Sequence, residues 1–440
     1  MAAEVSFYRL EDLDAAARQA LMVRTEDDLG GFMAQVEPVI AAVEAEGDQA
    51  LIRFAKRFDQ AEITEIKASE AEFDAAFDQV GAEVRSAIEY GIENIRRFHE
   101  EQMPEPMWLN EVRPGAFAGD RFTAIPSVAC YVPRGKGSFP SVLMMTTVPA
   151  VVAGVPRVVV LTPPGPDGTV DAASLVAARI AGVRDVYKCG GAQAVAAVAH
   201  GTDSVPRCHK IVGPGSPYFM AAKRLLAELI DPGTPAGPSE SIVLAERGSN
   251  PRLAALDVII ESEHGADSSA YLVTDCPELA AAARRYIPDY WAQMSEERVG
   301  YSSAVLGGPR GGIVLAPDMA AALAFVNDYA PEHLQILAAE PFTLMERIEH
   351  AGEILLGEHT PGTIANFVLG PNAVLPTSGA AKTASPLSVF DYMKRSSIGY
   401  VTSAGYPELA KHARTLALYE GFDGHAAAVS EARETARRDD

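Results

Sequence analysis

The sequence predicts an α/β protein with two tandem doubly wound units, each an incomplete Rossmann-like fold, a helical N-terminal region and a helical C-terminal appendage. Two observations predict this class: short apolar strands alternate with helices over about 127–238, and the alternation repeats over about 240–357. Such alternation indicates parallel sheets covered by helices on both faces. With 440 residues, 48% of them hydrophobic, the chain can form more than one core.

The first unit follows a mostly helical region. From about Tyr8 to Glu111, apolar residues recur at three and four positions, as in "ALIRFAKRF" and "AIEYGIENIRRF". Beyond it, strands are expected at "SVACYV", "RVVVL", "DVYKC" and "HKIVG". The helices between and after them are expected at "AASLVAARIAG", "GAQAVAAVA" and "SPYFMAAKRLLAELI".

The second unit repeats this order. Strands are expected at "SIVLA", "SAYLVT", "GGIVLA" and "GEILLG". Helices are expected at "NPRLAALDVIIESEH", capped by Asn250, and at "PELAAAARRYI" and "DMAAALAFVNDYA". After about Ser385 the pattern returns to helix, and this segment is too short for a core of its own. We therefore expect it to pack on another part of the protein.

Composition excludes several classes of function. The formal charge of -22 repels nucleic acid and anionic membranes, so we expect neither as a partner. The start, "MAAEVSFYRLEDLD", does not resemble a signal peptide, and prolines interrupt the most apolar stretch, "VPAVVAGVPRVVVL". The four cysteines form no C-x-x-C pair, which fits a reducing cytoplasm.

Two glycine-rich loops each follow a strand and open a helix: "CGGAQAV" and "VGPGSPY". Glycine lets backbone N–H groups approach a ligand, and a helix N-terminus favours phosphate. Neither loop completes G-x-G-x-x-G, because Tyr218 stands at the third glycine position of the second loop. The loops are therefore either tight turns or parts of a nucleotide site at the carboxyl ends of the strands.

The stretch "YAPEHL" sets Glu332 directly before His333, after Pro331. One interpretation is a helix end with a solvated acid and a hydrogen-bonded histidine; the other is a pair of proton-transfer groups.

Two further pairs combine a carboxylate with an imidazole. Glu261 and His264 stand three apart near a helix end and could contribute to a divalent metal site, although two ligands do not make one. Glu420 and His425 flank a glycine turn. A solvated ion pair and a surface helix cap are the alternative interpretations.

Ten segments together resemble the histidinol dehydrogenase family, from about Phe54 to the C-terminal helices. They are "YVPRGKGSFPSVLMM", "CGGAQAVAAVAHGT", "KIVGPGSPY", "AGPSES", "ESEHGADS", "NDYAPEHL", "LGEHTP", "GPNAVLPTSG", "PLSVFDYMKR" and "EGFDGHA". The resemblance implies an NAD- and zinc-dependent enzyme that oxidises an amino alcohol through the aldehyde to the acid. It also implies an intertwined homodimer, and the reference reaction is L-histidinol to L-histidine in histidine biosynthesis.

By this resemblance, Glu332 and His333 match the acid–base pair of the family. His333 would take the hydroxyl proton while hydride passes to NAD, and Glu332 would activate the water that attacks the aldehyde. We expect a strand-to-helix junction to carry both residues.

The resemblance also implies a zinc site. His264 and His425 match zinc ligands, and His425 would come from the partner subunit. At the other two ligand positions this chain has Glu261 for a glutamine and Asn366 for an aspartate. The exchange keeps one carboxylate and one amide, so we expect the metal to be retained.

The remaining site positions follow in the same way. Ser239 and Glu420 match substrate-contacting positions, and Tyr131 and Gln193 match positions that line the NAD site. Ser216 replaces an asparagine near NAD.

Other departures bear on the substrate. Ala373 replaces a histidine near the substrate, and Arg134 and Lys136 add positive charge to a nearby loop. These two cations are either solvated or indicate an anionic substrate, such as a hydroxy sulfonate or hydroxy acid.

The expected domains are an N-terminal helical arm (1–25), a catalytic α/β domain (26–130 plus 239–385), an NAD-binding Rossmann-like domain (131–238) and a C-terminal dimerisation segment (386–440). Three hypotheses remain open: histidinol oxidation, the same chemistry on another alcohol, and a catalytically silent NAD- or ligand-binding homologue.

Overall fold

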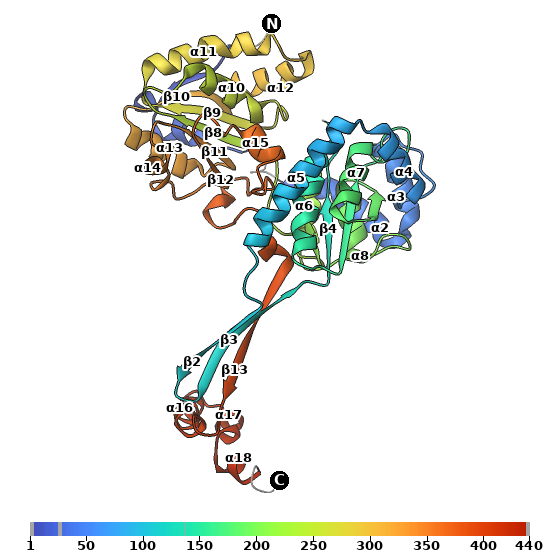
Figure 1. The fold of residues 1–440 in the computed structure, drawn as a ribbon, viewed down its shortest axis with the longest axis vertical. Helices are drawn as coiled ribbons and strands as arrows, with labels where there is room; N and C mark the ends of the chain where they lie inside the picture. The colour runs from blue at the N-terminus through green and yellow to red at the C-terminus, as the bar shows by residue number, and fades with distance from the viewer. Residues whose placement is uncertain (1–3, 25–28, 136, 437–440) are drawn as a thin grey trace. The chain divides into compact units, whose positions relative to one another are not determined.

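Two parallel sheets and one antiparallel sheet organise the chain (Figure 1). The computed structural model describes residues 4–24, 29–135 and 137–436. The chain divides into a larger unit, Met1–Gln102 with Ile125–Tyr392, and a smaller unit, Met103–Ala124 with Met393–Asp440. Both parallel sheets lie in the larger unit, so the predicted α/β class is confirmed. Within the described residues, no helix is long and apolar enough to cross a membrane.

The first sheet has the strand order of half a Rossmann fold, β6-β5-β4-β7, with all strands parallel. Its strands are β4 (Ser127–Tyr131), β5 (Arg157–Thr162), β6 (Asp185–Lys188) and β7 (Lys210–Val212). The helices that follow them are α6 (Pro140–Val152), α7 (Ala172–Ala181), α8 (Gly191–His200) and α9 (Pro217–Leu225). The chain changes direction across the sheet between β4 and β7, where ligands bind in this kind of fold.

The helices before this sheet pack against the helices that cover it. They are α2 (Gly30–Glu46), α3 (Asp48–Phe58), α4 (Glu70–Gln79) and α5 (Ala82–Glu101). Val43 and Phe54, for example, share one hydrophobic core with Ala129 of β4. The same core contains Val195 of α8 and Phe219 of α9, so it extends from these helices into residues 131–238. Helical periodicity identifies a buried face but not the sheet that covers it.

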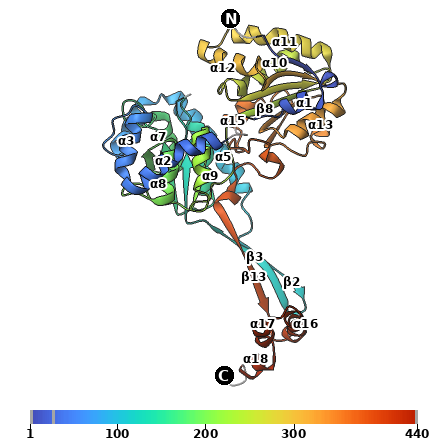
Figure 2. The same cartoon turned by 180° about the vertical axis from the view of Figure 1, so that it is seen from behind.

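The second sheet is also parallel, in the order β1-β10-β9-β8-β11-β12. Its strands are β1 (Phe7–Arg9), β8 (Glu240–Ala245), β9 (Ser269–Thr274), β10 (Gly311–Leu315), β11 (His333–Leu337) and β12 (Glu353–Leu356). Helices α10 (Pro251–Ser262), α11 (Pro277–Trp291) and α12 (Glu296–Leu306) cover one face. The other face packs against α13 (Met319–Tyr329), α14 (Pro341–Met345) and residues around α1 (Ala15–Ala20). Figure 2 shows α1 and α13 at this face from behind.

The smaller unit contradicts two helical expectations. It contains an antiparallel sheet of β2 (Met107–Arg113), β3 (Ala116–Ala124) and β13 (Met393–Val401), followed by α16 (Tyr406–Tyr419), α17 (Asp423–Ala428) and α18 (Glu431–Ala436). Every residue of β2 is exposed. Without one buried face, a strand loses the alternation that would identify it in a sequence. Two strands of the second parallel sheet, β1 and β11, were also not predicted from the sequence.

Asp257 is a buried carboxylate that links α10 to β11. It accepts a hydrogen bond from Gln335 Nε2 (2.8 Å), and burial raises its pKa to about 6, with Glu358 adding to the shift. The folded chain therefore holds the proton to higher pH than the unfolded chain. Asp257 thus lowers the free energy of unfolding as the pH rises from about 4 through about 6.

Replacing Asp257 by Asn should therefore stabilise the protein, because the amide oxygen can accept the same hydrogen bond without a buried charge. The gain should be about 1 kcal/mol larger at pH 8 than at pH 5. Urea unfolding of wild type and variant at both pH values measures it. An equal gain at both values, or a loss at pH 8, would contradict the assignment.

Candidate active site

Glu332 and His333 lie at a helix-to-strand junction. Helix α13 ends at Tyr329, and β11 begins at His333, so the expected strand-to-helix junction is wrong. Between them Ala330 adopts a left-handed conformation with φ 52°, which is costly for a residue with a Cβ atom. This turn, followed by Pro331, ends the helix and brings both site residues to the amino edge of the second sheet.

The imidazole of His333 is enclosed by three carboxylates. Its Nδ1 lies 2.5 Å from Glu353 Oε1, and its Nε2 lies 3.7 Å from Glu332 Oε2 and 3.9 Å from Glu261 Oε2. All four side chains are at most 8% exposed. Burial alone would lower the pKa of His333, but the three carboxylates outweigh it and raise the pKa to about 10.

Glu332 is held from the neighbouring strand. Its Oε2 accepts a hydrogen bond from the backbone N–H of Glu240 (2.9 Å), the first residue of β8. Burial raises the pKa of Glu332 well above its ordinary value, although His333 opposes the shift. A buried carboxyl group whose pKa is raised in this way binds a proton more readily than an exposed one, which suits acid–base work.

A buried ion pair supports Glu240 in turn. Its Oε1 accepts hydrogen bonds from Arg24 Nε (3.0 Å) and from the backbone N–H of Ser378 (2.8 Å). The Arg24 guanidinium also lies 3.4 Å from the centroid of the Tyr329 ring and donates to the Tyr329 carbonyl. Arg24 therefore ties the end of α13 to the start of β8, the two places from which Glu332 is held.

Three of the four predicted metal ligands come together. Glu261 and His264 lie at the end of α10, with Oε2 and Nδ1 3.2 Å apart. Asn366 lies on α15 (Gly362–Phe367), and its Nδ2 donates to Glu261 Oε1 (2.7 Å). The Oδ1 of Asn366 is buried and has no hydrogen-bond partner among the residues that the structure describes. This free acceptor lies beside a carboxylate and an imidazole, the kind of atom that a metal ion would take.

Glu261 is the centre of this group. Burial would raise its pKa, but His264 and His333, with hydrogen bonds from Asn366 and Ser239, together hold the pKa below its ordinary value. The predicted substrate residue Ser239 is thereby placed at the same edge of the sheet. In the part of the chain that the structure describes, no three His, Cys, Asp or Glu side chains are arranged to hold a metal. The candidate set depends on the amide of Asn366.

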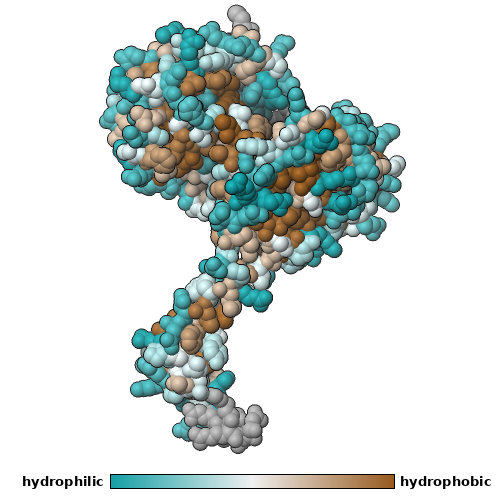
Figure 3. Space-filling model, viewed as in Figure 1, coloured by the Kyte–Doolittle hydropathy of each residue, from teal (hydrophilic) through white to brown (hydrophobic). Residues whose placement is uncertain are grey.

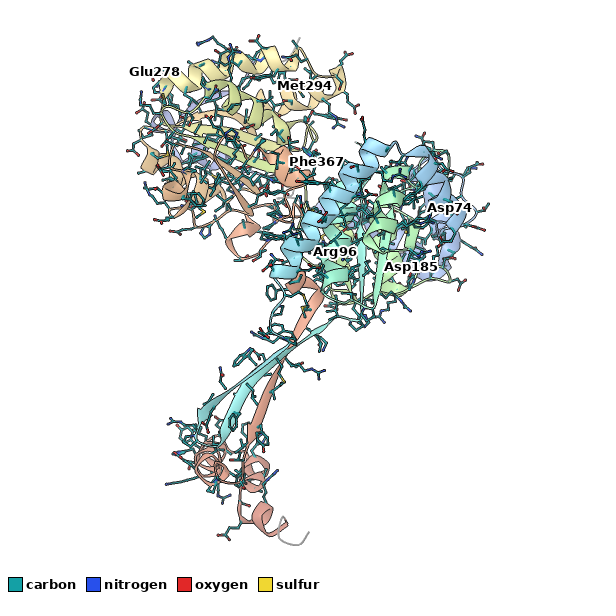
Figure 4. The ribbon with its side chains drawn as sticks, viewed as in Figure 1. Asp74, Arg96, Asp185, Glu278, Met294 and Phe367 are labelled. Atoms are coloured by element: carbon teal, nitrogen blue, oxygen red, sulfur yellow. The ribbon has the colours of Figure 1, made fainter. Side chains whose placement is uncertain are left out.

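Helix α15 is fixed from the other sheet. Asn94 Nδ2 on α5 donates to the carbonyl of Val368 (2.8 Å), the residue after α15. Figure 4 labels Phe367 at the end of α15 and Arg96 on α5. The position of Asn366 therefore depends on a helix that packs on α6 and α7, two helices of the first sheet's layer.

The other predicted ligand and substrate residue lie in the smaller unit. Glu420 follows α16 and His425 lies in α17, and both are exposed.

The predicted cofactor residues lie at the carboxyl edge of the first sheet. Tyr131 is the last residue of β4, and its ring stacks on that of Phe219 with the ring centroids 4.0 Å apart. The Tyr131 hydroxyl accepts a hydrogen bond from the Gly191 N–H (3.0 Å). Gln193 is buried in α8. Ser216 caps α9, where its Oγ accepts from the Phe219 N–H at 3.5 Å.

One glycine of these loops has a packing reason. Gly213 has φ 117°, and a Cβ atom there would lie 2.3 Å from the Tyr131 carbonyl oxygen. It is therefore required by a close backbone approach, whether or not a ligand binds nearby.

The structure describes two of the three residues that raised the question of substrate charge, Arg134 and Ala373. Arg134 donates to the Thr169 carbonyl (3.1 Å), and its charge lowers the pKa of Asp167 after the larger effect of Thr169. Arg134 thus fits the interpretation as a loop cation. Lys136 lies outside the described residues. Ala373 is half-buried beside Asn372, which lines the same cavity as Glu353.

Sequence reasoning missed Glu353, Glu240 and Arg24. Glu353 opens "EILL", and its importance comes from the pairing of β12 with β11, which sets it opposite His333. Arg24 and Glu240 are 216 positions apart. A charged residue at the first position of an apolar strand was the available signal for both glutamates.

The fold and site together define a class: an α/β protein with a Rossmann-type sheet and a buried carboxylate–imidazole centre on a second sheet. Comparison with known proteins agrees. The family model described as "Histidinol dehydrogenase" matches residues 22–433. The chain belongs to the histidinol dehydrogenase family, a family of NAD-dependent dehydrogenases.

Individual relatives match over nearly their whole length. "Histidinol dehydrogenase homolog 2" of Mesorhizobium japonicum is 62% identical, covering 98% of each chain. "Histidinol dehydrogenase" of Synechocystis sp. is 47% identical, covering 96% of this chain and 98% of the relative. The crystal structure of histidinol dehydrogenase from Elizabethkingia anophelis superposes with a TM-score of 0.93 at 28% identity, covering 99% of this chain and 100% of that one.

The Arg24–Glu240 pair leads to a stability prediction. Replacing Arg24 by Met should lower the free energy of unfolding by about 3–5 kcal/mol, because Glu240 stays buried without its ion-pair partner. The matched control is Arg18→Met, since Arg18 pairs with Asp328 at the same 3.0 Å on the surface and should contribute less than about 1 kcal/mol. Denaturant unfolding compares them, and equal losses would refute the role of the buried pair.

Proposed function

We propose that this protein is an NAD- and zinc-dependent dehydrogenase that oxidises a primary alcohol, with L-histidinol as the reference substrate, through the aldehyde to the carboxylate. The observation that carries the proposal is the buried His333 imidazole enclosed by Glu261, Glu332 and Glu353. Family membership supplies the type of reaction. The geometry supplies groups that can hold and move protons.

His333 takes the hydroxyl proton at Nε2 while hydride leaves for NAD. In the second step Glu332 would take a proton from the water that attacks the aldehyde, and the resulting hydrate would give up a second hydride to a second NAD. Both groups are almost fully buried, so bulk water does not compete for their protons. The backbone N–H of Glu240 holds the Glu332 carboxylate in place for this step.

Zinc fits the charge of this site. Glu261, Glu332 and Glu353 set three buried carboxylates around one imidazole, and buried negative charge is costly unless a cation balances it. The ligands would be Glu261, His264 and Asn366, with His425 of a second copy completing the four. Bound there, the metal would polarise the alcohol oxygen. By neutralising Glu261 it would also bring the pKa of His333 down toward the range of a general base.

NAD would bind at the carboxyl edge of the first sheet, within the proposed domain 131–238. The β6-β5-β4-β7 order places a direction change beside Tyr131, and two helices begin at the glycine loops there. Gln193 and Ser216 belong to the same edge. The remaining segments of the larger unit, including 239–385, would carry the chemistry.

The proposed partner is a second copy of the chain, joined through 386–440. Large apolar side chains of the smaller unit are exposed, and Tyr419 is 91% exposed. Figure 3 shows hydrophobic residues, in brown, on the surface of this unit. Large apolar side chains that are exposed on one unit favour burial of that unit in an interface. Glu420 and His425 would then serve the site of the partner. A cytoplasmic location fits four buried, unpaired cysteines.

A second candidate keeps the chemistry and changes the alcohol. The relatives from Mesorhizobium japonicum and Colwellia psychrerythraea, 62% and 58% identical, carry the name "homolog", and Ala373 replaces an imidazole of the family pattern. A hydroxy sulfonate or hydroxy acid is the alternative substrate. A silent homologue is the third possibility, and the intact Glu332–His333 site speaks against it.

Activity is tested with NAD and a panel of histidinol, amino alcohols, hydroxy sulfonates and hydroxy acids. On the best substrate, His333→Asn should slow alcohol oxidation by about 10²–10⁴. Glu332→Gln should mainly slow the aldehyde-to-acid step. His350→Asn is the control, because His350 also lies near a glutamate (4.0 Å) but on the surface. Near-wild-type turnover of His333→Asn, or no activity of the wild type on any alcohol, would refute the proposal.

The exchanged ligands predict coupled metal binding. Glu261→Gln should reduce zinc retention, because it removes the carboxylate from the candidate set. Adding Asn366→Asp restores one carboxylate beside it and should recover much of the loss, so the two changes should be non-additive. Zinc content after dialysis against a chelator series measures this. Full retention by Glu261→Gln, or no recovery in the double variant, would argue against this ligand set.

A further inference from the structure

Glu353 holds the side of the His333 ring that faces away from the other two carboxylates. The parallel pairing of β11 and β12 sets His333 opposite Glu353. The two residues therefore lie side by side at the amino edge of the sheet, and Glu353 Oε1 lies 2.5 Å from His333 Nδ1. Both side chains are 8% exposed, so the contact is shielded from water.

This contact determines which ring nitrogen is free. An ionised carboxylate can only accept hydrogen bonds, so Nδ1 must carry the hydrogen when the imidazole is neutral. The free lone pair is then on Nε2, the nitrogen that faces Glu332 and Glu261. The other tautomer would direct the lone pair at Glu353 and leave no base at the reacting side.

We propose that Glu353 is a positioning residue that fixes the tautomer and orientation of His333, so that Nε2 is the proton acceptor. The inference rests on the proposed role of His333 as the base. Glu353 does not contact the reacting atoms in this arrangement, since it lies on the Nδ1 side. A carboxylate paired with the far nitrogen of a catalytic histidine acts in this way in other enzymes.

Glu353 also borders open space. It lines a cavity of ≈ 600 Å³ together with Gln102, Asn372, Leu387 and Asp391, among others. Removing its side chain would therefore open a path from this cavity to Nδ1. A small carboxylate such as formate could then take the place of the missing group.

The test compares Glu353→Ala and Glu353→Gln with the control Glu349→Ala, which removes an exposed glutamate near His350. In metal-loaded enzyme, Glu353→Ala should lower kcat by about 10²–10⁴ with little change in KM for NAD, and formate should restore part of the loss. The kcat of Glu353→Gln should lie between that of the wild type and that of Glu353→Ala, because an amide oxygen still accepts a hydrogen bond from Nδ1–H but carries no charge. Turnover of Glu353→Ala equal to that of Glu349→Ala, or a loss that formate does not reduce, would overturn the proposal.

A second measurement does not depend on turnover. In metal-loaded protein with ¹⁵N-labelled histidine, the His333 signals are assigned by their loss in His333→Asn and followed over a pH series. The neutral ring should carry hydrogen on Nδ1 in the wild type and shift toward the Nε2–H tautomer in Glu353→Ala. An unchanged tautomer would overturn the role of Glu353 even if the protein oxidises alcohols. A shifted tautomer in a protein without alcohol activity would refute only the proposed function.

Discussion

The concentration of buried carboxylates around His333 is the constraint on which the site depends. Three acidic groups within 3.9 Å of one ring, each at most 8% exposed, repel one another and gain stability only from the imidazole and from hydrogen-bond donors. The structure supplies those donors from separate elements: the N–H of Glu240 for Glu332, and the amide of Asn366 for Glu261. The remaining negative charge is what a divalent cation would balance.

The candidate site residues lie at opposite edges of the two parallel sheets. In the first, the glycine loops and Tyr131 lie at the carboxyl ends of the strands, where nucleotides bind in doubly wound folds. In the second, Glu240, His333 and Glu353 are each the first residue of their strands, so the polar cluster lies at the amino ends. The geometry of this polar cluster therefore depends on strand register and on the helix ends of α10 and α13.

The sequence predicted much of this arrangement and missed specific parts of it. Apolar strands and amphipathic helices could be predicted because burial on both faces of a sheet gives its strands a strongly apolar composition. The pairs Glu332–His333 and Glu261–His264 were found because their members are close together in the sequence. Glu353 could not be found in this way, because its partner is 20 positions away and meets it only through strand pairing. The exposed strand β2 showed no alternation of apolar and polar residues. The packing of α2–α5 against the helices of the first sheet depends on contacts that periodicity does not encode.

The stoichiometry of the reaction tests the central claim most directly. If one buried site performs both oxidation steps, a limiting amount of the true alcohol substrate should yield two equivalents of reduced NAD per alcohol, with no free aldehyde accumulating. Reduced cofactor is counted by absorbance, and the product is identified by mass spectrometry. One equivalent with release of aldehyde would contradict the account, because Glu332 would then have no second step to catalyse.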